Sequence, residues 1–169
     1  MQIRTSTGAV MYEAEFRAYT KANGGPTWET TTTEVLTALG ADVVFEGPQA
    51  TGGTVYQYSQ ASGVEQVDGK WYTKYILGPV FTDRAATETE AAQTAAEQEA
   101  AYKAMRDAEQ AVSVRAARDT KLAETDWVVI KNLELNANIP GAWEVYRQAL
   151  RDVPTQTGFP WTITWPVQP

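Results

Sequence analysis

The chain of 169 residues contains neither cysteine nor histidine. Without cysteine it can form no disulfide, no thiolate metal site and no cysteine nucleophile. Without histidine it lacks the commonest general base and the commonest metal ligand. A metal site would need oxygen ligands alone, and no acidic residues follow the spacing of a calcium-binding loop. We therefore expect no cofactor and no bound metal.

Basic runs and long apolar runs are also missing. The formal net charge is −7, which disfavours nucleic acid as a partner because such binding relies on Lys and Arg against phosphates. No apolar stretch approaches the ~20 residues that cross a bilayer. The start, Met1–Ser6, lacks the apolar centre of a signal peptide. We expect no nucleic-acid partner, no membrane partner and a location in a cytoplasm.

Catalytic groups are equally hard to find. Glutamates stand two residues apart in three places: Glu13 and Glu15, Glu88 and Glu90, and Glu97 and Glu99. On a helix this spacing points side chains to different faces, so the carboxylates would not converge on a substrate. The glycine-rich stretch Gly47–Gly53 lacks the Gly-Lys-Ser/Thr ending of a phosphate-binding loop. We expect that the protein is not an enzyme.

Residues 1–81 are rich in Gly, Thr and aromatic residues and predict a small α+β module. Thr7-Gly8 and Asp68-Gly69 are hairpin-turn signals. The periodicity predicts helices over 12–19 and 33–39 and strands over 42–45, 54–59 and 70–77.

Residues 82–117 form the second predicted segment, a long helix that extends to about residue 122. Ala, Glu, Gln, Arg and Lys dominate, and no Gly or Pro occurs from Val80 to Ile139. Tyr102, Met105 and Val112 belong to a weak repeat of 3.5 residues. The helix is either a solvated spacer or a coiled coil of small residues. This seam is too small to hold a coil alone, so we expect the isolated protein to be monomeric or weakly associated.

Residues 118–169 form the third predicted segment, a small helical domain with a terminal strand. Pro140 suits the first turn of a helix. The following residues place apolar side chains on one face, at Trp143, Tyr146, Leu150 and Val153. Arg147 and Arg151 lie one turn apart beside that face. The stretch before Pro140 reads as a linker.

The last seventeen residues carry no charge but hold four prolines and three large aromatic residues. A chain end is normally polar and mobile, so an end of this composition must bury itself on its own domain or on a partner. Trp161–Trp165 alternates apolar and polar residues, which predicts a strand with Trp161, Ile163 and Trp165 on one face.

Two interpretations of these aromatic residues are compatible. They form the core of a minimal domain, or some stay exposed as interface residues, since Trp, Tyr and Arg dominate binding hot spots. The predicted partner-binding residues are Trp143, Tyr146, Arg147, Leu150, Arg151, Phe159, Trp161, Ile163 and Trp165.

This region resembles the phage tail assembly chaperones, also called tail fibre assembly proteins. The matching text is Arg118-Asp119-x-Lys121-Leu122-Ala123-x-Thr125-Asp126-Trp127, then Ala142-Trp143-x-x-Tyr146-Arg147-Gln148-Ala149-Leu150-Arg151-Asp152, then Pro154-x-Gln156-x-Gly158-Phe159-Pro160-x-x-Ile163-x-Trp165-Pro166. More loosely, Met1–Phe45 and Val67–Trp71 look like leader modules of tail-fibre-associated proteins.

The resemblance implies an assembly protein that binds subunits of a trimeric tail fibre, and other tail or baseplate proteins, in the host cytoplasm. It would help the subunits fold, trimerise or attach, without catalysing a reaction. The alternative is a structural component, a co-fibre or adaptor that stays in the virion tail. An aromatic strand next to an Arg-flanked helix could cap unpaired strand edges of the fibre.

Overall fold

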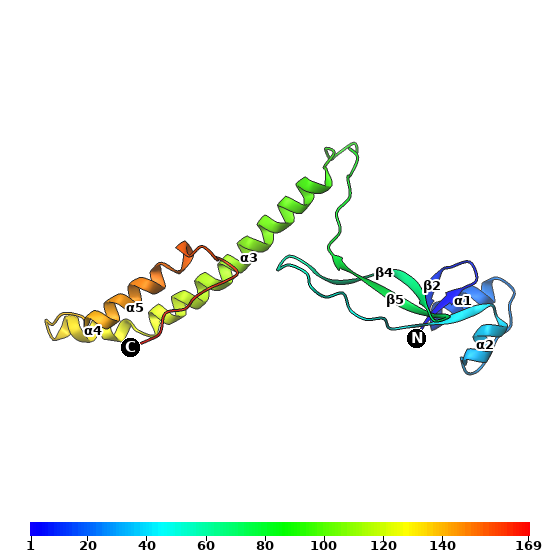
Figure 1. The fold of residues 1–169 in the computed structure, drawn as a ribbon, viewed down its shortest axis with the longest axis horizontal. Coiled ribbons are helices and arrows are strands. Elements are labelled where there is room, and N and C mark those ends of the chain that lie inside the picture. The colour runs from blue at the N-terminus through cyan, green and yellow to red at the C-terminus, as the bar shows by residue number, and fades with distance from the viewer. The chain divides into compact units, whose positions relative to one another are not determined.

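The computed structural model describes residues 1–169 and divides into two compact units, Met1–Val80 (unit 1) and Phe81–Pro169 (unit 2) (Figure 1). Helices and a five-stranded sheet together confirm the predicted α+β class. The predicted division into three segments stays a prediction. No helix is long and apolar enough to cross a bilayer.

Unit 1 is built on one sheet in the order β2-β1-β3-β5-β4. Its elements are β1 (Gln2–Thr5), β2 (Val10–Tyr12), α1 (Glu13–Ala22), α2 (Thr33–Ala38), β3 (Ala41–Phe45), β4 (Tyr58–Val67) and β5 (Lys70–Gly78). Only the β3–β5 pair is parallel. The core contains Ile3, Phe16, Leu36 and Ala41, so α1 and α2 cover one face of the sheet.

Turn chemistry explains the hairpins. Asp68 and Gly69 both have positive φ, 49° and 76°, which is typical of the two-residue hairpin turn whose twist matches that of the strands.

The predicted strand over 54–59 begins later than expected, since β4 starts at Tyr58. Residues 54–57 form a turn instead, because the Gln57 N–H donates to the Thr54 carbonyl and the Gln57 side chain accepts from the Thr54 N–H.

Unit 2 begins with an irregular stretch rather than with the long helix. The prediction of helix from residue 82 was wrong, because α3 spans Ala95–Ala123. Thr94 and Glu97 form a capping box that fixes its start: the Glu97 N–H donates to the Thr94 hydroxyl at 3.2 Å and the Thr94 N–H donates to Glu97 at 2.8 Å. Before it, Arg84 and Gln93 pair as an isolated bridge.

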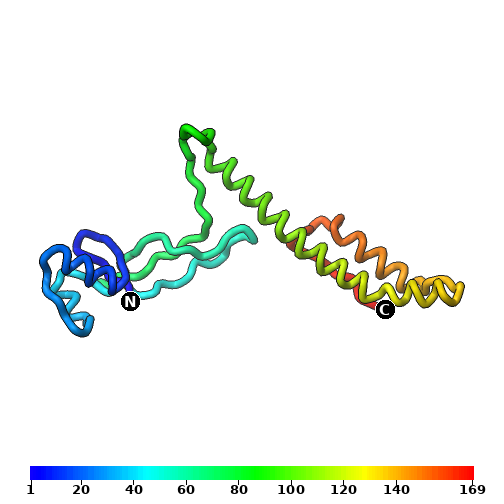
Figure 2. The backbone as a smooth tube through the Cα atoms, turned by 180° about the vertical axis from the view of Figure 1, so that it is seen from behind, coloured from blue at the N-terminus to red at the C-terminus, as the bar shows by residue number.

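After α3 come α4 (Asp126–Glu134), α5 (Gly141–Arg151) and a 3₁₀ turn (Val153–Thr155). Pro140 directly precedes α5, as its N-cap. The prediction of a linker before Pro140 was wrong in its first half, since α4 occupies it. Figures 1 and 2 show α5 running back beside α3, and the two helices are in contact.

The predicted terminal strand was also wrong. Residues 159–169, here called the tail, form a turn and then a segment without a paired strand. The tail contacts α3 instead (Figure 2). The alternation of the sequence nevertheless appears in the burial, because Trp161, Ile163 and Trp165 are half-buried while Thr162 and Thr164 are exposed.

The capping box predicts an acid-sensitive start of α3. The pKa of Glu97 is lowered because the Thr94 N–H and then the Thr94 hydroxyl donate to the carboxylate. This stabilisation is therefore present above the ordinary pKa of a glutamate and is lost as the pH falls through the lowered pKa. Thr94→Ala should weaken the start of α3 by about 1 kcal/mol at neutral pH.

Amide hydrogen exchange over residues 95–100 measures this effect. The matched variant Thr120→Ala, an exposed threonine late in α3, should leave those amides unchanged. Equal exchange in the Thr94→Ala variant and the parent protein would contradict the assigned cap.

Candidate partner-binding surface

The region that carries the resemblance is organised around the guanidinium group of Arg147. Arg147 is 8% exposed and donates to the carbonyl of Leu122 at 2.9 Å, to the hydroxyl of Thr125 at 2.6 Å and to the carboxylate of Asp126 at 2.7 Å. These three acceptors lie where α3 ends and α4 begins. We call the four residues the Arg147 cluster.

The cluster adds a charged donor to the end of α3. The Leu122 carbonyl is among the last of that helix and accepts from the Thr125 N–H at 3.1 Å and the Thr125 hydroxyl at 2.9 Å as well as from Arg147. A positive charge is also favoured at a helix C-terminus. Asp126 is largely exposed and opens α4, so one arginine of α5 ties two helix ends together. A lysine could not form this fork, since its ammonium is a single point donor.

The apolar face of α5 points into unit 2, as the spacing predicted. Tyr146, Leu150 and Val153 are buried, and Trp143 is half-buried. Trp143 packs edge-on against Trp127 at 6.0 Å between ring centroids. The exposed side of α5 carries Glu144, Val145, Gln148 and Arg151.

The tail lies against α3 through contacts of different kinds. The Trp161 indole N–H donates to the carboxylate of Asp107 at 2.6 Å. Arg115 lies over the Phe159 ring at 5.2 Å, and Lys121 lies over the Trp165 ring at 5.5 Å. Cations over aromatic faces stabilise such packing by about 0.5–1 kcal/mol at exposed sites. The tail thus covers part of its own unit.

An apolar stripe on α4 is the surface that the sequence reasoning missed. Trp127, Ile130 and Leu133 stand at i, i+3 and i+6 on the helix and are 55%, 55% and 78% exposed. We call these three residues the α4 stripe. Leu135, just beyond the helix, is exposed as well. The helical spacing of these apolar residues was a signal in the sequence, but this stretch was interpreted as a linker.

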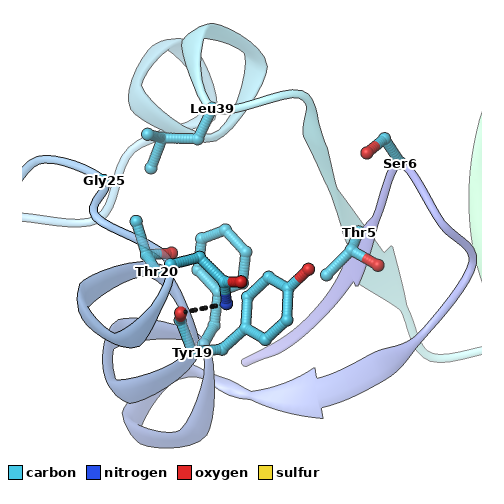
Figure 3. Close-up of a pocket in the computed structure, with 8 residues that line it drawn as sticks. Thr5, Ser6, Tyr19, Thr20, Gly25 and Leu39 are labelled. Carbon is cyan, nitrogen blue, oxygen red and sulfur yellow. Dashed lines mark hydrogen bonds between the residues drawn. The ribbon is translucent and has the colours of Figure 1, made fainter.

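Unit 1 contains a separate hollow of about 220 Å³ between α1, the end of β1 and the residue that follows α2, Leu39 (Figure 3). Thr5, Ser6, Tyr19 and Thr20 line it, together with the apolar Leu39. Figure 3 shows the Tyr19 hydroxyl directed towards Thr5. No charged side chain lines the hollow, and Tyr19 is its one titratable residue.

Comparison with known proteins bears on unit 2 alone. Residues 111–169 match the family described as phage tail assembly chaperone protein. The match confirms the resemblance inferred from residues 118–169. The matched stretch begins earlier than that, at residue 111 inside α3. No curated protein and no solved structure matches the chain. The match supports a role in phage tail assembly.

The matched stretch contains every predicted partner-binding residue. These residues differ from one another in burial. Tyr146, Arg147 and Leu150 lie in the interior of unit 2, whereas Arg151 is exposed. Trp143, Phe159, Trp161, Ile163 and Trp165 are half-buried. Their contact with a partner stays a prediction.

The contact of Trp161 with Asp107 predicts a measurable loss of stability. Trp161→Phe removes the indole donor and keeps a ring, so it should lower the free energy of unfolding by about 1–2 kcal/mol in chemical denaturation. Trp165→Phe is the matched control, because it makes the same change at a ring that contacts Lys121 through its face. Equal losses in both variants would show that ring size, and not the hydrogen bond, matters.

Proposed function

We propose that the protein is an assembly chaperone for the tail fibre of a bacteriophage. It binds subunits of the trimeric fibre in the host cytoplasm, aids their folding, trimerisation or attachment, and catalyses no reaction. The family match over residues 111–169 carries this proposal. The match supports tail assembly in general, and the choice of the fibre as partner is ours.

The α4 stripe supports a binding role for unit 2. Neighbouring exposed apolar side chains on one helix face mark interaction sites more often than isolated ones do. Trp127 is the kind of residue that dominates interface energetics, and its contact with Trp143 holds the ring in place. Tyr146, Arg147 and Leu150 then serve binding indirectly, by holding α4 and α5 together beneath the stripe.

Co-expression tests the proposal. The fibre subunit encoded in the same phage genome is produced with and without this protein, and soluble trimer is measured by size exclusion with light scattering. We expect more soluble trimer and a detectable complex when both proteins are present. The proposal would be overturned if the fibre subunit trimerises equally well alone and does not bind this protein.

The stripe gives a specific variant. Leu133→Asp places a charge where an apolar contact forms, so it should weaken fibre binding at least tenfold, while the melting temperature stays within about 2 °C because Leu133 is exposed. Val112→Asp is the control, an apolar residue of α3 that is also largely exposed. Unchanged fibre binding by the Leu133→Asp variant would remove the stripe from the interface.

A second candidate is a structural virion component, a co-fibre or adaptor that remains bound to the fibre or baseplate. Unit 1 favours it, because this unit lies outside the family match and has its own sheet and core. Mass spectrometry of purified particles separates the two candidates. A stoichiometric copy in the particle indicates the structural component, and absence indicates the transient chaperone.

A further inference from the structure

The tail is hydrogen-bonded along one edge of its backbone by a side chain. The Thr164 N–H donates to Gln156 Oε1 at 2.9 Å, and Gln156 Nε2 donates to the Thr164 carbonyl at 2.9 Å. An N–H and a carbonyl of one residue that bond to the same partner form the pattern of a hydrogen-bonded pair in an antiparallel sheet. The Gln156 carboxamide thus takes the place of a neighbouring strand on this edge.

The other edge of the tail has no such partner. In an extended chain, successive residues direct their N–H and carbonyl groups to opposite edges. The backbone groups of Ile163, Trp165 and Val167 therefore point away from the Gln156 edge. They make no hydrogen bond within the chain. We call this side of the tail the open edge.

The position of Pro166 agrees with this division. Proline lacks an N–H and interrupts a ladder wherever that donor is needed. Pro166 stands two residues from Thr164 in the segment after the turn, and so belongs to the Gln156 edge. The open edge keeps its donors at Ile163, Trp165 and Val167. The tail thus has one edge that can accept a strand and one that cannot extend a ladder past Pro166.

The tail is also held in place before any partner arrives. Trp161 and Trp165 contact α3, and Ile163 lies half-buried between them. Ordering a flexible segment costs free energy on binding, and a segment that is already held avoids most of that cost. Hydrogen-bonding groups spaced at every second residue are matched by an extended backbone and not by a helix.

We propose that the open edge, Ile163 to Val167, binds an extended, proline-free segment of the tail protein that this chain assists. This inference rests on the proposed function and names how that partner is held. Fibre subunits are a fitting source, since strand edges stay unpaired until a fibre assembles. The tail carries no charged side chain, so an uncharged segment suits it. A fibre subunit can contact the α4 stripe as well, whereas paired tails of two copies would offer only a few hydrogen bonds.

The test uses the full chain, labelled with ¹⁵N, and a defined probe. The probe is an acetylated and amidated peptide of alternating Thr and Val, which carries no charged side chain and no proline. We expect amide hydrogen exchange at Ile163, Trp165 and Val167 to slow at least tenfold on binding, while Thr164 stays unchanged. Protection of other residues alone, or no binding at millimolar peptide, would overturn the proposal.

Two proline variants sharpen the test. Val167→Pro removes a donor from the open edge, and its side chain is 90% exposed, so packing is unaffected. It should weaken peptide binding about tenfold, because one carbonyl of the peptide then lacks its donor. Gln168→Pro removes a donor from the Gln156 edge and should bind like the parent, as should Val167→Ala. Equal affinity of the two proline variants would contradict the open edge.

Sedimentation of the chain alone provides the remaining control. A dimer that dissociates on Val167→Pro would assign the open edge to a second copy and would overturn the partner assignment. The proposed function is judged separately, by fibre trimerisation with the parent protein. If the fibre assembles with the parent protein but the peptide does not bind, the proposal for the open edge is rejected and the proposed function stands.

Discussion

The arrangement of unit 2 depends on one buried arginine. Arg147 reaches from α5 to the point where α3 ends and α4 begins. Its three acceptors are the carbonyl of Leu122, the hydroxyl of Thr125 and the carboxylate of Asp126. A buried charge is costly unless its donors are satisfied, and these bonds provide that satisfaction. The direction of α4, and with it the exposure of Trp127, Ile130 and Leu133, follows from this connection.

Unit 2 divides its apolar residues between two tasks. Leu150, Val153 and Val128 are buried and hold the helices together. The α4 stripe stays exposed, and the tail is held on α3 with one edge of its backbone unpaired. A protein that only needed stability would bury such side chains, because apolar burial is the main source of folding free energy. Surfaces of this kind are consistent with a protein whose partner completes them.

The sequence predicted local features well where one periodicity or turn signal dominated. The helix after Pro140 and its buried face were confirmed, as was the Asp68-Gly69 hairpin. The predicted start of α3 was wrong, because the helix propensity of residues 82–94 was taken as sufficient and the Thr94–Glu97 capping box was overlooked. The tail shows why pattern alone is not enough. Its alternation was correct, but a strand also needs a neighbouring strand, and here a glutamine side chain and a helix take that place.

Buried polar contacts were beyond reach of the sequence. The pairing of Arg147 with Leu122 and Thr125 joins positions more than twenty residues apart, and such a bond becomes visible only once the helices are placed. Arg147 and Arg151 looked equivalent in the sequence, yet one is buried and the other exposed. Their different roles follow from tertiary packing and not from helical spacing.

The most direct test of this account is amide hydrogen exchange, measured by mass spectrometry, on the full chain and its Arg147→Met variant. If Arg147 holds the junction, the variant should lose protection across the end of α3, all of α4 and the start of α5, while unit 1 keeps its protection. Arg151→Met, on the exposed side of α5, should leave the pattern unchanged. Loss of protection confined to the residues next to Arg147 would contradict the central role given to this arginine.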